Sequence, residues 1–560
     1  MPIILFCLFS VLFGLISAWW NHGLSQHASI LILITSAVAS IGTVHATKQL
    51  ALQGLKGKLS KYTVWDKLMF FIWGVVSFRS FFWLIYESKN NWVIQAPNNL
   101  GDLAYHIHLI KFLESTKEYW PVNPIFSFSH LHYPIGADFF NSILLSAGLG
   151  LIPGLISVGF TGSMLIAYKL QKWGGAFAMA AFLFGGGTAI VGMVSHPAFI
   201  DWQDKVDWKN PYLAMIITQR GLLYAIPAGI WLLIQWRKEA ANFDTSKMWL
   251  EVLILCTLPL FSIHTFLYFV GLLICLIIFN TNREYWIVLL AVSTLPSLLC
   301  LWLVTGFEGE GKIFWNPGWM PNGNTLTFWI NNFGVIIPLM VICTWQCLTN
   351  STDRAFAIGA SCCFVLCTIV SFAPWPWDNT KLMVWSWITI LPLIWEHILR
   401  HLAVGFRIIV LAALFITGAT SVAYRTTTNP NIILLRLEEK WKAQELTKGL
   451  DRTSKIAAAP TYNHPLSMLG FPLIAGYEGH LWSHGINYRK ELSLLKKVLQ
   501  GEAGWEDSAK QLGINYIYWG NEERKMFPTS AKLWEAAGFP TTQVKDTMLI
   551  EISRKIEHTK

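Results

Sequence analysis

The sequence predicts a mainly α-helical, polytopic membrane protein that ends in a small α/β domain. Two observations predict this fold class. Of the 560 residues, 54% are hydrophobic and only 13% are charged, whereas about a quarter of the residues in an average soluble domain are charged. The charges are also unevenly distributed, because residues 1–424 carry 41 of them and the last 136 residues carry 34. We therefore expect a transmembrane domain over 1–424 and a soluble domain over 425–560.

The same composition excludes other classes of protein. The net charge of +9 is spread thinly, and no run of like charge is long enough for a nucleic-acid-binding patch, so no nucleic acid is expected as a partner. All nine cysteines lie in apolar runs without metal-ligand spacing to histidine. Such cysteines are typical of apolar packing residues rather than of a disulfide framework.

A transmembrane helix needs about 20 mostly apolar residues, and thirteen segments approach this requirement. The pair 249–263 and 266–280 is short enough to form one kinked unit, and the run 139–168 is long and broken by Gly and Pro, so the count holds to within about two spans. The first segment lacks a basic start and a small-residue cleavage site, and we expect it to be retained rather than removed as a signal peptide. The predicted spans are 3–21, 28–46, 68–86, 139–168, 174–193, 221–236, 249–263, 266–280, 286–304, 333–348, 355–373, 382–398 and 405–424.

The distribution of Lys and Arg predicts the orientation of these spans, because cytoplasmic loops carry more of both residues. If 47–67 is cytoplasmic and the spans alternate, the inner loops hold 13 Lys and Arg in about 57 residues, and the outer loops hold 8 in about 123. The long loops 87–138, 194–220 and 305–332 and the C-terminal domain are then extracytoplasmic. We expect a multi-pass protein of a bacterial inner membrane.

The soluble domain alternates short apolar runs with helical ones. Helices are predicted over 433–450, 492–500 and 505–512, and strands over 455–460 and 514–519.

The first polar motif of the outer loops places Asp102 and His106 four residues apart. They share a face if a helix begins after Asn99, and the apolar residues that follow predict an amphipathic helix at the outer membrane interface. Asp102 is the candidate general base of an active site. The alternative is a carboxylate that caps the helix, beside a solvated histidine.

The end of the same loop, Ser129–Asp138, contains His130, His132 and Asp138. Asp138 is a candidate substrate-binding residue. The two histidines could bind a metal together with Asp102 or Asp138, although alternating histidines in an extended segment more often do not. A divalent metal cofactor is therefore left open.

The loop at 194–220 begins near His196 and contains aspartates at every third position, followed by Arg220 at the start of a span. Asp201 is the candidate binding residue among these aspartates, and a solvated acidic face is the alternative. Arg220 could meet a lipid phosphate. Arg79 lies well inside the third span, where an arginine requires a partner such as a carboxylate or a phosphate.

The short loop at 374–381 places Asp378 and Lys381 beside two tryptophans. These residues suit contacts to sugar hydroxyl groups and phosphate, and interfacial tryptophans are the alternative. In the C-terminal domain, the segments 459–465 and 476–489 are rich in Gly, His and aromatic residues. They predict a loop that holds a polar ligand or one that packs over the membrane domain.

With these features the chain resembles the GT-C-type membrane glycosyltransferases. It is similar to a group of large multi-pass proteins that share four motifs. Those motifs are matched here by Gly101-Asp102 with His106, by Gln219-Arg220, by Trp377 to Lys381, and by Trp482 to Tyr488.

The resemblance implies transfer of a sugar from a polyprenyl-phosphate donor to a glycan, lipid or protein acceptor at the outer membrane face, as in hexosyl- and mannosyltransferases. Asp102 matches the catalytic acid of the first loop, and His106, Asp138, Asp201, Arg220, Asp378, Lys381 and Arg79 are the candidate substrate and phosphate contacts.

The chain departs from the family pattern in three respects. Two extra spans precede the family's usual first span, the first loop lacks Asp-x-Asp, and the tail lacks Trp-Trp-Asp-Tyr-Gly. The missing motifs argue against an oligosaccharyltransferase. The alternatives in other classes are a lipid or glycan transporter and a non-catalytic glycan-binding membrane protein. A transporter would have polar residues near the membrane midplane and two related halves. The sequence has one such polar residue, Arg79, and no related halves.

Overall fold

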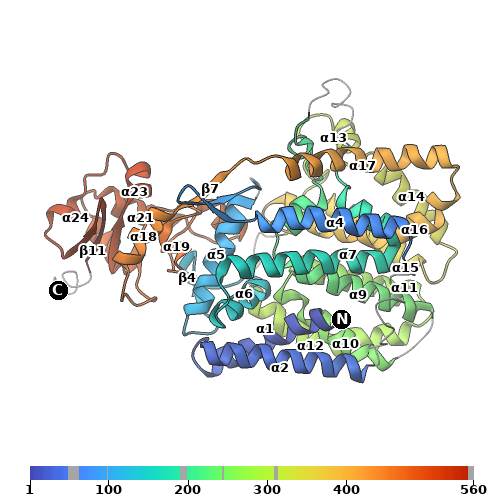
Figure 1. Cartoon of the computed structure of the whole chain (residues 1–560), viewed down its shortest axis with the longest axis horizontal. Coiled ribbons are helices and arrows are strands. Elements are labelled where there is room, and N and C mark those ends of the chain that lie inside the picture. Colours follow the sequence, from blue (N-terminus) through green and yellow to red (C-terminus); the bar gives the residue numbers. More distant parts are fainter. Residues whose placement is uncertain (48–61, 97–98, 189–198, 242–244, 308–312, 553–560) are drawn as a thin grey trace.

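The computed structural model describes residues 1–47, 62–96, 99–188, 199–241, 245–307 and 313–552 (Figure 1). Outside these ranges lie Lys48, Lys56, Lys58 and Lys61 of the predicted cytoplasmic loop, and His196 of the loop at 194–220.

Long helices dominate the chain up to residue 427 and run roughly along its long axis, while the C-terminal residues gather at one end, beside α5 (Figure 1). Between the helices lie the short strand pairs β3 (Val122–Asn123) with β4 (Phe126–His130) and β5 (Phe314–Trp315) with β6 (Val370–Ser371). The helices are α1 (Pro2–Trp20), α2 (Gln26–Ala46), α4 (Val64–Phe82), α5 (Leu100–Ser115), α6 (Gly136–Ser146), α7 (Leu151–Leu183), α9 (Leu222–Ala241), α10 (Met248–Thr257), α11 (Ile263–Phe279), α12 (Arg283–Thr305), α13 (Thr325–Phe333), α14 (Ile336–Cys347), α15 (Arg354–Cys367), α16 (Thr380–His397) and α17 (Val404–Thr427).

Several of these helices are suited to crossing a membrane. In the described ranges, six are long and apolar enough, or seven if α13 and α14, which meet at a bend of 75°, form one broken span. The six are α1, α2, α7, α12, α17 and α16 with its flanking turns, and α11 and α15 are shorter apolar helices. The chain is thus a multi-pass membrane protein. These helices are fewer than the thirteen predicted spans, so the count of thirteen stays a prediction.

The boundaries predicted for the spans 139–168 and 174–193 are wrong. Helix α6 ends at Ser146, and α7 runs from Leu151 to Leu183 with non-helical backbone at Gly174 and Gly175. The Trp73 indole donates to the carbonyl of Ser163 at 3.1 Å, and its ring lies 6.0 Å from that of Phe182. An unbroken helix would separate Ser163 from Phe182 by about 28 Å. The chain therefore reverses at the two glycines, where Gly175 has a φ of +65°.

The first strand of residues 425–552, called the tail below, joins a sheet formed mainly by the first long loop. The hairpin of β1 (Tyr86–Ser88) and β2 (Asn91–Ile94) accepts β7 (Ile432–Arg436) as an antiparallel third strand. The helix predicted to begin at 433 is therefore wrong over its first turn, and α18 covers only Leu437–Leu446. The apolar residues of β7 pair with the exposed edge of the hairpin, which buries Leu434 and Leu435.

The rest of the tail forms a four-stranded sheet in the order β10-β11-β9-β8, in which β8 and β9 are parallel. The predicted helices 492–500 and 505–512 correspond to α21 and α22, and the predicted strands contain β8 and β9. The elements are β8 (Ile456–Ala457), β9 (Tyr516–Trp519), β10 (Thr541–Val544), β11 (Thr547–Glu551), α19 (Pro465–Met468), α20 (Glu478–Ser483), α21 (Arg489–Gln500), α22 (Trp505–Leu512), α23 (Asn521–Met526) and α24 (Leu533–Ala536).

A buried hydrogen-bonded pair, Glu523 and His464, holds the centre of the tail together. Glu523 and His464 are fully buried, with Glu523 Oε1 2.9 Å from His464 Nε2. The same carboxylate accepts the backbone N–H groups of Ala459 at 2.7 Å and Gly520 at 2.8 Å. Burial alone would raise the pKa of Glu523, but His464 and these N–H groups outweigh it and hold the pKa below its usual value of 4.5.

Replacing Glu523 with glutamine is expected to destabilise the tail by about 2 kcal/mol, because an amide NH₂ group would face a buried N–H donor. Since its pKa is lowered, the wild-type carboxylate contributes its full stability above pH 4.5, and this contribution is lost as the pH falls through the lower pKa of the folded state. Thermal unfolding of the full chain between pH 3 and 7 measures both effects. Equal stability of the variant at neutral pH would contradict the assignment.

Candidate active site beside helix α5

Helix α5 begins where the sequence predicts and places Asp102 in its first turn. Asn99 is the N-cap residue, and neither its side chain nor that of Asp102 forms a capping hydrogen bond. Instead, Asp102 Oδ2 accepts a hydrogen bond from the side-chain amide of Gln219 at 3.0 Å. Gln219 lies just before α9, so the carboxylate is tied to the membrane domain rather than to its own helix.

The amphipathic character predicted for this helix is wrong. Every residue from Leu103 to Ile110 is buried, as are Phe112 and Leu113. The tail covers one side of the helix, where the His108 ring lies within 2.8 Å of the carbonyl of Phe471. A helix packed on most sides does not lie on a membrane surface. It carries Asp102 inside the protein, between the tail and the ends of the membrane helices.

This setting changes the acidity of Asp102. Burial raises the pKa of its carboxyl group above the usual 3.8, while His106, Lys381 and the amide of Gln219 act in the opposite direction and Asp378 adds to the rise. The ionised form of a carboxyl group with a raised pKa is a stronger base. Asp102 therefore combines burial, an orienting hydrogen bond and nearby charged groups.

His106 and Asp138 form a buried pair next to Asp102. His106 Nδ1 lies 2.9 Å and 3.0 Å from the two carboxylate oxygens of Asp138, which occupies the first turn of α6 and is only 1% exposed. The pairing orients the His106 ring, because it determines which ring nitrogen faces the carboxylate.

Arg220 is buried near the same carboxylate. Its Nη2 donates a long, weak hydrogen bond to the carbonyl of Leu155 at 3.5 Å. Its Nε has no hydrogen-bond partner among the described residues. Burial lowers the pKa of Arg220 to about 10, and Asp138 opposes this shift. The side chain therefore stays charged at neutral pH, with a donor left over for a negatively charged ligand.

The 374–381 loop contributes a second cation. Lys381 Nζ lies 3.1 Å from Asp378 Oδ1, at the junction of the 3₁₀ turn Pro376–Asn379 and α16. Both residues interact electrostatically with Asp102 and with His264, at the start of α11. Asn379 fixes this loop by donating to the carbonyls of Cys367 and Val370 at 2.8 and 2.7 Å.

Aromatic residues from the tail and the first loop close the other side of the site. The Tyr105 ring lies 5.1–5.2 Å from the rings of Tyr133, His480 and His484, and Tyr133 stacks on His484. Burial raises the pKa of Tyr133 well above 10, and the charges of Asp138, Asp102 and Asp378 add to the rise. Tyr133, His480 and His484 belong to the polar segments 129–138 and 476–489, but their sequence pattern predicts no role for these three residues.

Two predicted site residues lie elsewhere. Asp201 forms an ion pair with Arg425 in the last turn of α17. Arg79 lies in the last turn of α4 rather than well inside the span. Its expected carboxylate or phosphate partner is replaced by the carbonyls of Thr426 and Thr428, at 3.1 and 3.0 Å, together with the side-chain oxygens of Gln95 and Asn429. Asp201 and Arg79 thus anchor the end of α17 and the linker after it.

A metal-binding set near Asp102 is not assembled by the described part of the chain. Within it, the one group of three acidic or histidine side chains close enough to share an ion is Asp353, Glu396 and His397. These residues lie at the far ends of the membrane helices. His130 is exposed on β4, and the His132 ring packs against Gly306.

Comparison with known proteins yields no matching family model and no matching curated protein. Among solved structures, the chain is similar to the oligosaccharyltransferase of Archaeoglobus fulgidus in its apo form, with 11% identity and a TM-score of 0.49 over 81% of this chain and 69% of that one. Two further structures are similar over the same shares of both chains. They are AglB of this organism with an inhibitory peptide and a dolichol-phosphate, at 12% and 0.48, and its oligosaccharyltransferase tethered to an acceptor peptide, at 11% and 0.47.

Proposed function

We propose that the protein is a membrane glycosyltransferase that moves a sugar from a polyprenyl-phosphate donor to an acceptor at the membrane face where Asp102 lies. The observation that carries this proposal is the partly buried Asp102 carboxylate, whose pKa is raised, with Lys381 nearby and Arg220 beside the neighbouring Asp138. A polyprenyl-phosphate sugar keeps its tail in lipid and its sugar in water. Its site must therefore lie at the ends of membrane helices, as this site lies at the starts of α9, α11 and α16.

The arrangement fits a direct displacement at the anomeric carbon of the donor. Asp102 accepts the proton of the acceptor hydroxyl group as its oxygen forms the new glycosidic bond. The bond between the anomeric carbon and the phosphate oxygen breaks, and the phosphate leaves with the electron pair. Arg220 and Lys381 stabilise that departing charge, since preorganised cations are most effective where negative charge develops.

The two sides of the site suit different substrates. The cations lie on the membrane helices, where a lipid-linked phosphate arrives. Tyr105, Tyr133, His480 and His484 form an aromatic wall between the first loop and the tail. Aromatic rings provide flat apolar faces with polar edges, which suits the acceptor. The Asp102 carboxylate lies between the two sides.

Transfer by the purified chain tests this proposal. The full-length protein, reconstituted in vesicles, is incubated with radiolabelled polyprenyl-phosphate sugars and a membrane extract that supplies acceptors. We expect release of polyprenyl phosphate and label on a second molecule. A transporter would instead move the donor across the bilayer with its sugar–phosphate bond intact, and that outcome would contradict the proposal.

The orientation of the site is a separate prediction. If the end that carries the tail is extracytoplasmic, a cysteine that replaces the exposed Lys497 should react with a membrane-impermeant maleimide in intact cells. A cysteine that replaces the exposed Lys67, at the start of α4, should react only after the cells are opened. The reverse pattern would place the site on the cytoplasmic face.

A further inference from the structure

A polar pocket lies at the opposite ends of the helices that build the Asp102 site. Three helices connect the two places. In α7, Leu155 accepts the contact from Arg220 and Lys172 lines the pocket. Helix α9 begins just after Arg220 and carries Arg237 near its other end. Helix α16 carries Lys381 in its first turn and ends at His397. A rise of 1.5 Å per residue puts about 25 Å between the site and the pocket.

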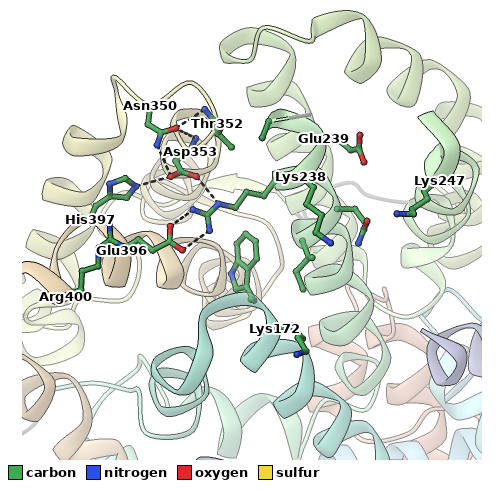
Figure 2. Close-up of a pocket in the computed structure, with 15 residues that line it drawn as sticks. Lys172, Lys238, Glu239, Lys247, Asn350, Thr352, Asp353, Glu396, His397 and Arg400 are labelled. Atoms are coloured by element: carbon green, nitrogen blue, oxygen red, sulfur yellow. Dashed lines mark hydrogen bonds and ion pairs between the residues drawn. The ribbon is translucent and has the colours of Figure 1, made fainter. Parts of the chain in front are cut away.

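The pocket has a volume of about 860 Å³ and a strongly cationic lining. Figure 2 shows that its charged side chains come from several separate elements, with Asp353, Glu396 and His397 close together and Lys172, Lys247 and Arg400 farther apart. Five of them are cations, three are carboxylates and one is a histidine. These are Lys172, Arg237, Lys238, Lys247 and Arg400, then Glu239, Asp353 and Glu396, and His397.

The carboxylates on one side of the pocket already have a cation. Arg237 Nε donates to Asp353 Oδ1 at 2.9 Å, and its two terminal nitrogens donate to the two oxygens of Glu396 at 3.2 and 2.5 Å. Asp353 Oδ2 also lies 3.0 Å from His397 Nε2 and accepts from the Asn350 amide at 3.2 Å (Figure 2). Arg237 therefore compensates the charges of Asp353 and Glu396, two of the three residues that could otherwise hold a metal ion.

With those two carboxylates engaged, the balance of the lining is positive. Lys172, Lys238, Lys247 and Arg400 remain, with Glu239 as the other carboxylate. A concave surface that collects one sign of charge attracts ligands of the opposite sign. The pocket is thus suited to an anion rather than to a cation.

The surroundings place this pocket at the level of lipid headgroups. Lys172 Nζ lies 5.0 Å from the ring of Tyr62 and 5.7 Å from that of Tyr168. At the same end, Trp65 and Trp249 are 70% and 47% exposed. Exposed tryptophan and tyrosine side chains concentrate at the boundary between lipid and water.

We propose that this pocket binds the phosphate group of an anionic ligand at the membrane surface opposite the Asp102 site. Lys238 and Lys247 contact the phosphate, and Lys172 and Arg400 complete the cationic rim. The ion-paired Arg237 forms a rigid floor. The Lys and Arg distribution predicts that this end is cytoplasmic, where anionic phospholipids supply such a group. The proposal does not depend on the activity assigned to the Asp102 site.

Lipid retention by the full chain tests the proposal. The protein is purified in a mild detergent and titrated with phosphatidylglycerol or phosphatidylcholine, and bound lipid is counted by native mass spectrometry. We expect wild type to bind phosphatidylglycerol preferentially. The double variant Lys238→Gln/Lys247→Gln should bind it at least about tenfold more weakly, because each ammonium near a lipid phosphate contributes a factor of about five.

The matched control is Lys67→Gln/Arg283→Gln, which removes two exposed cations from the same end outside the pocket lining. It should bind as wild type does. A second titration with inorganic phosphate distinguishes the source of the ligand. Phosphate binding that is lost in the Lys238/Lys247 variant, without a preference for phosphatidylglycerol, would assign the site to a free phosphate group. Equal behaviour of both double variants with both probes would overturn the proposal.

Discussion

Replacing Asp102 with asparagine is expected to lower the rate of sugar transfer by about 100- to 10,000-fold, the typical contribution of a general base. The amide oxygen of asparagine can still accept the hydrogen bond from Gln219, so the protein should insert and fold normally. What the variant loses is the basic carboxylate. Transfer assays on membranes that contain equal amounts of each protein measure the effect.

The pH dependence of transfer provides an independent readout. The base acts only when ionised, so wild-type activity should fall as the pH drops through the pKa of Asp102, which burial raises above 3.8. The residual activity of the variant should lack this acidic limb. The control Glu114→Gln removes a carboxylate from the same helix, outside the site, and should behave like wild type. Normal transfer by Asp102→Asn would remove the base from the mechanism.

Features of the fold that depend on local sequence could be predicted, and those that depend on distant partners could not. Helices α21 and α22 follow from the helical periodicity of their apolar residues, and the start of α5 follows from the polar residues at Asn99 and Asp102. Strand β7 was missed because its extended form depends on pairing with the 86–94 hairpin, far earlier in the chain. The burial of α5 was missed for the same reason, since the tail covers it.

The candidate site follows the same division. Asp102, Asp138, Arg220 and Lys381 stand out as charged residues in loops of one membrane face, and the structure brings them near one another. Asp201 also stood out as a charged residue in a loop of this face. Its pairing with Arg425 could not be predicted, because it depends on where α17 ends.

The residues of the aromatic wall could not be singled out from the sequence. In a chain with 29 Trp, 16 Tyr and 35 Phe, single aromatic residues such as Tyr133 give no contrast against the many that face lipid or the core. His484 meets Tyr133, and His480 meets Tyr105, only because the tail folds over α5.

Replacing Arg220 with glutamine is expected to lower transfer by about 100- to 1,000-fold, which is typical for the loss of one group that stabilises charge in the transition state. The same change should leave the thermal unfolding midpoint unchanged or raise it. Arg220 is 2% exposed, its Nε has no partner among the described residues, and its contact with Leu155 is long. A buried charge with so few partners costs stability in the unliganded protein, so its removal relieves that cost while the phosphate loses its cation.

The control Arg425→Gln should show the opposite pattern. Arg425 is the ion-pair partner of the buried Asp201, and its removal takes this pairing away from the carboxylate. Breaking a buried pair from one side typically costs about 3 kcal/mol, so this variant should unfold at a lower temperature, and the folded fraction should keep a near-normal rate of transfer. If Arg220→Gln instead lost stability and activity together, as a structural residue does, Arg220 would hold the helices in place rather than bind the donor phosphate. The cationic half of the site would then rest on Lys381 alone.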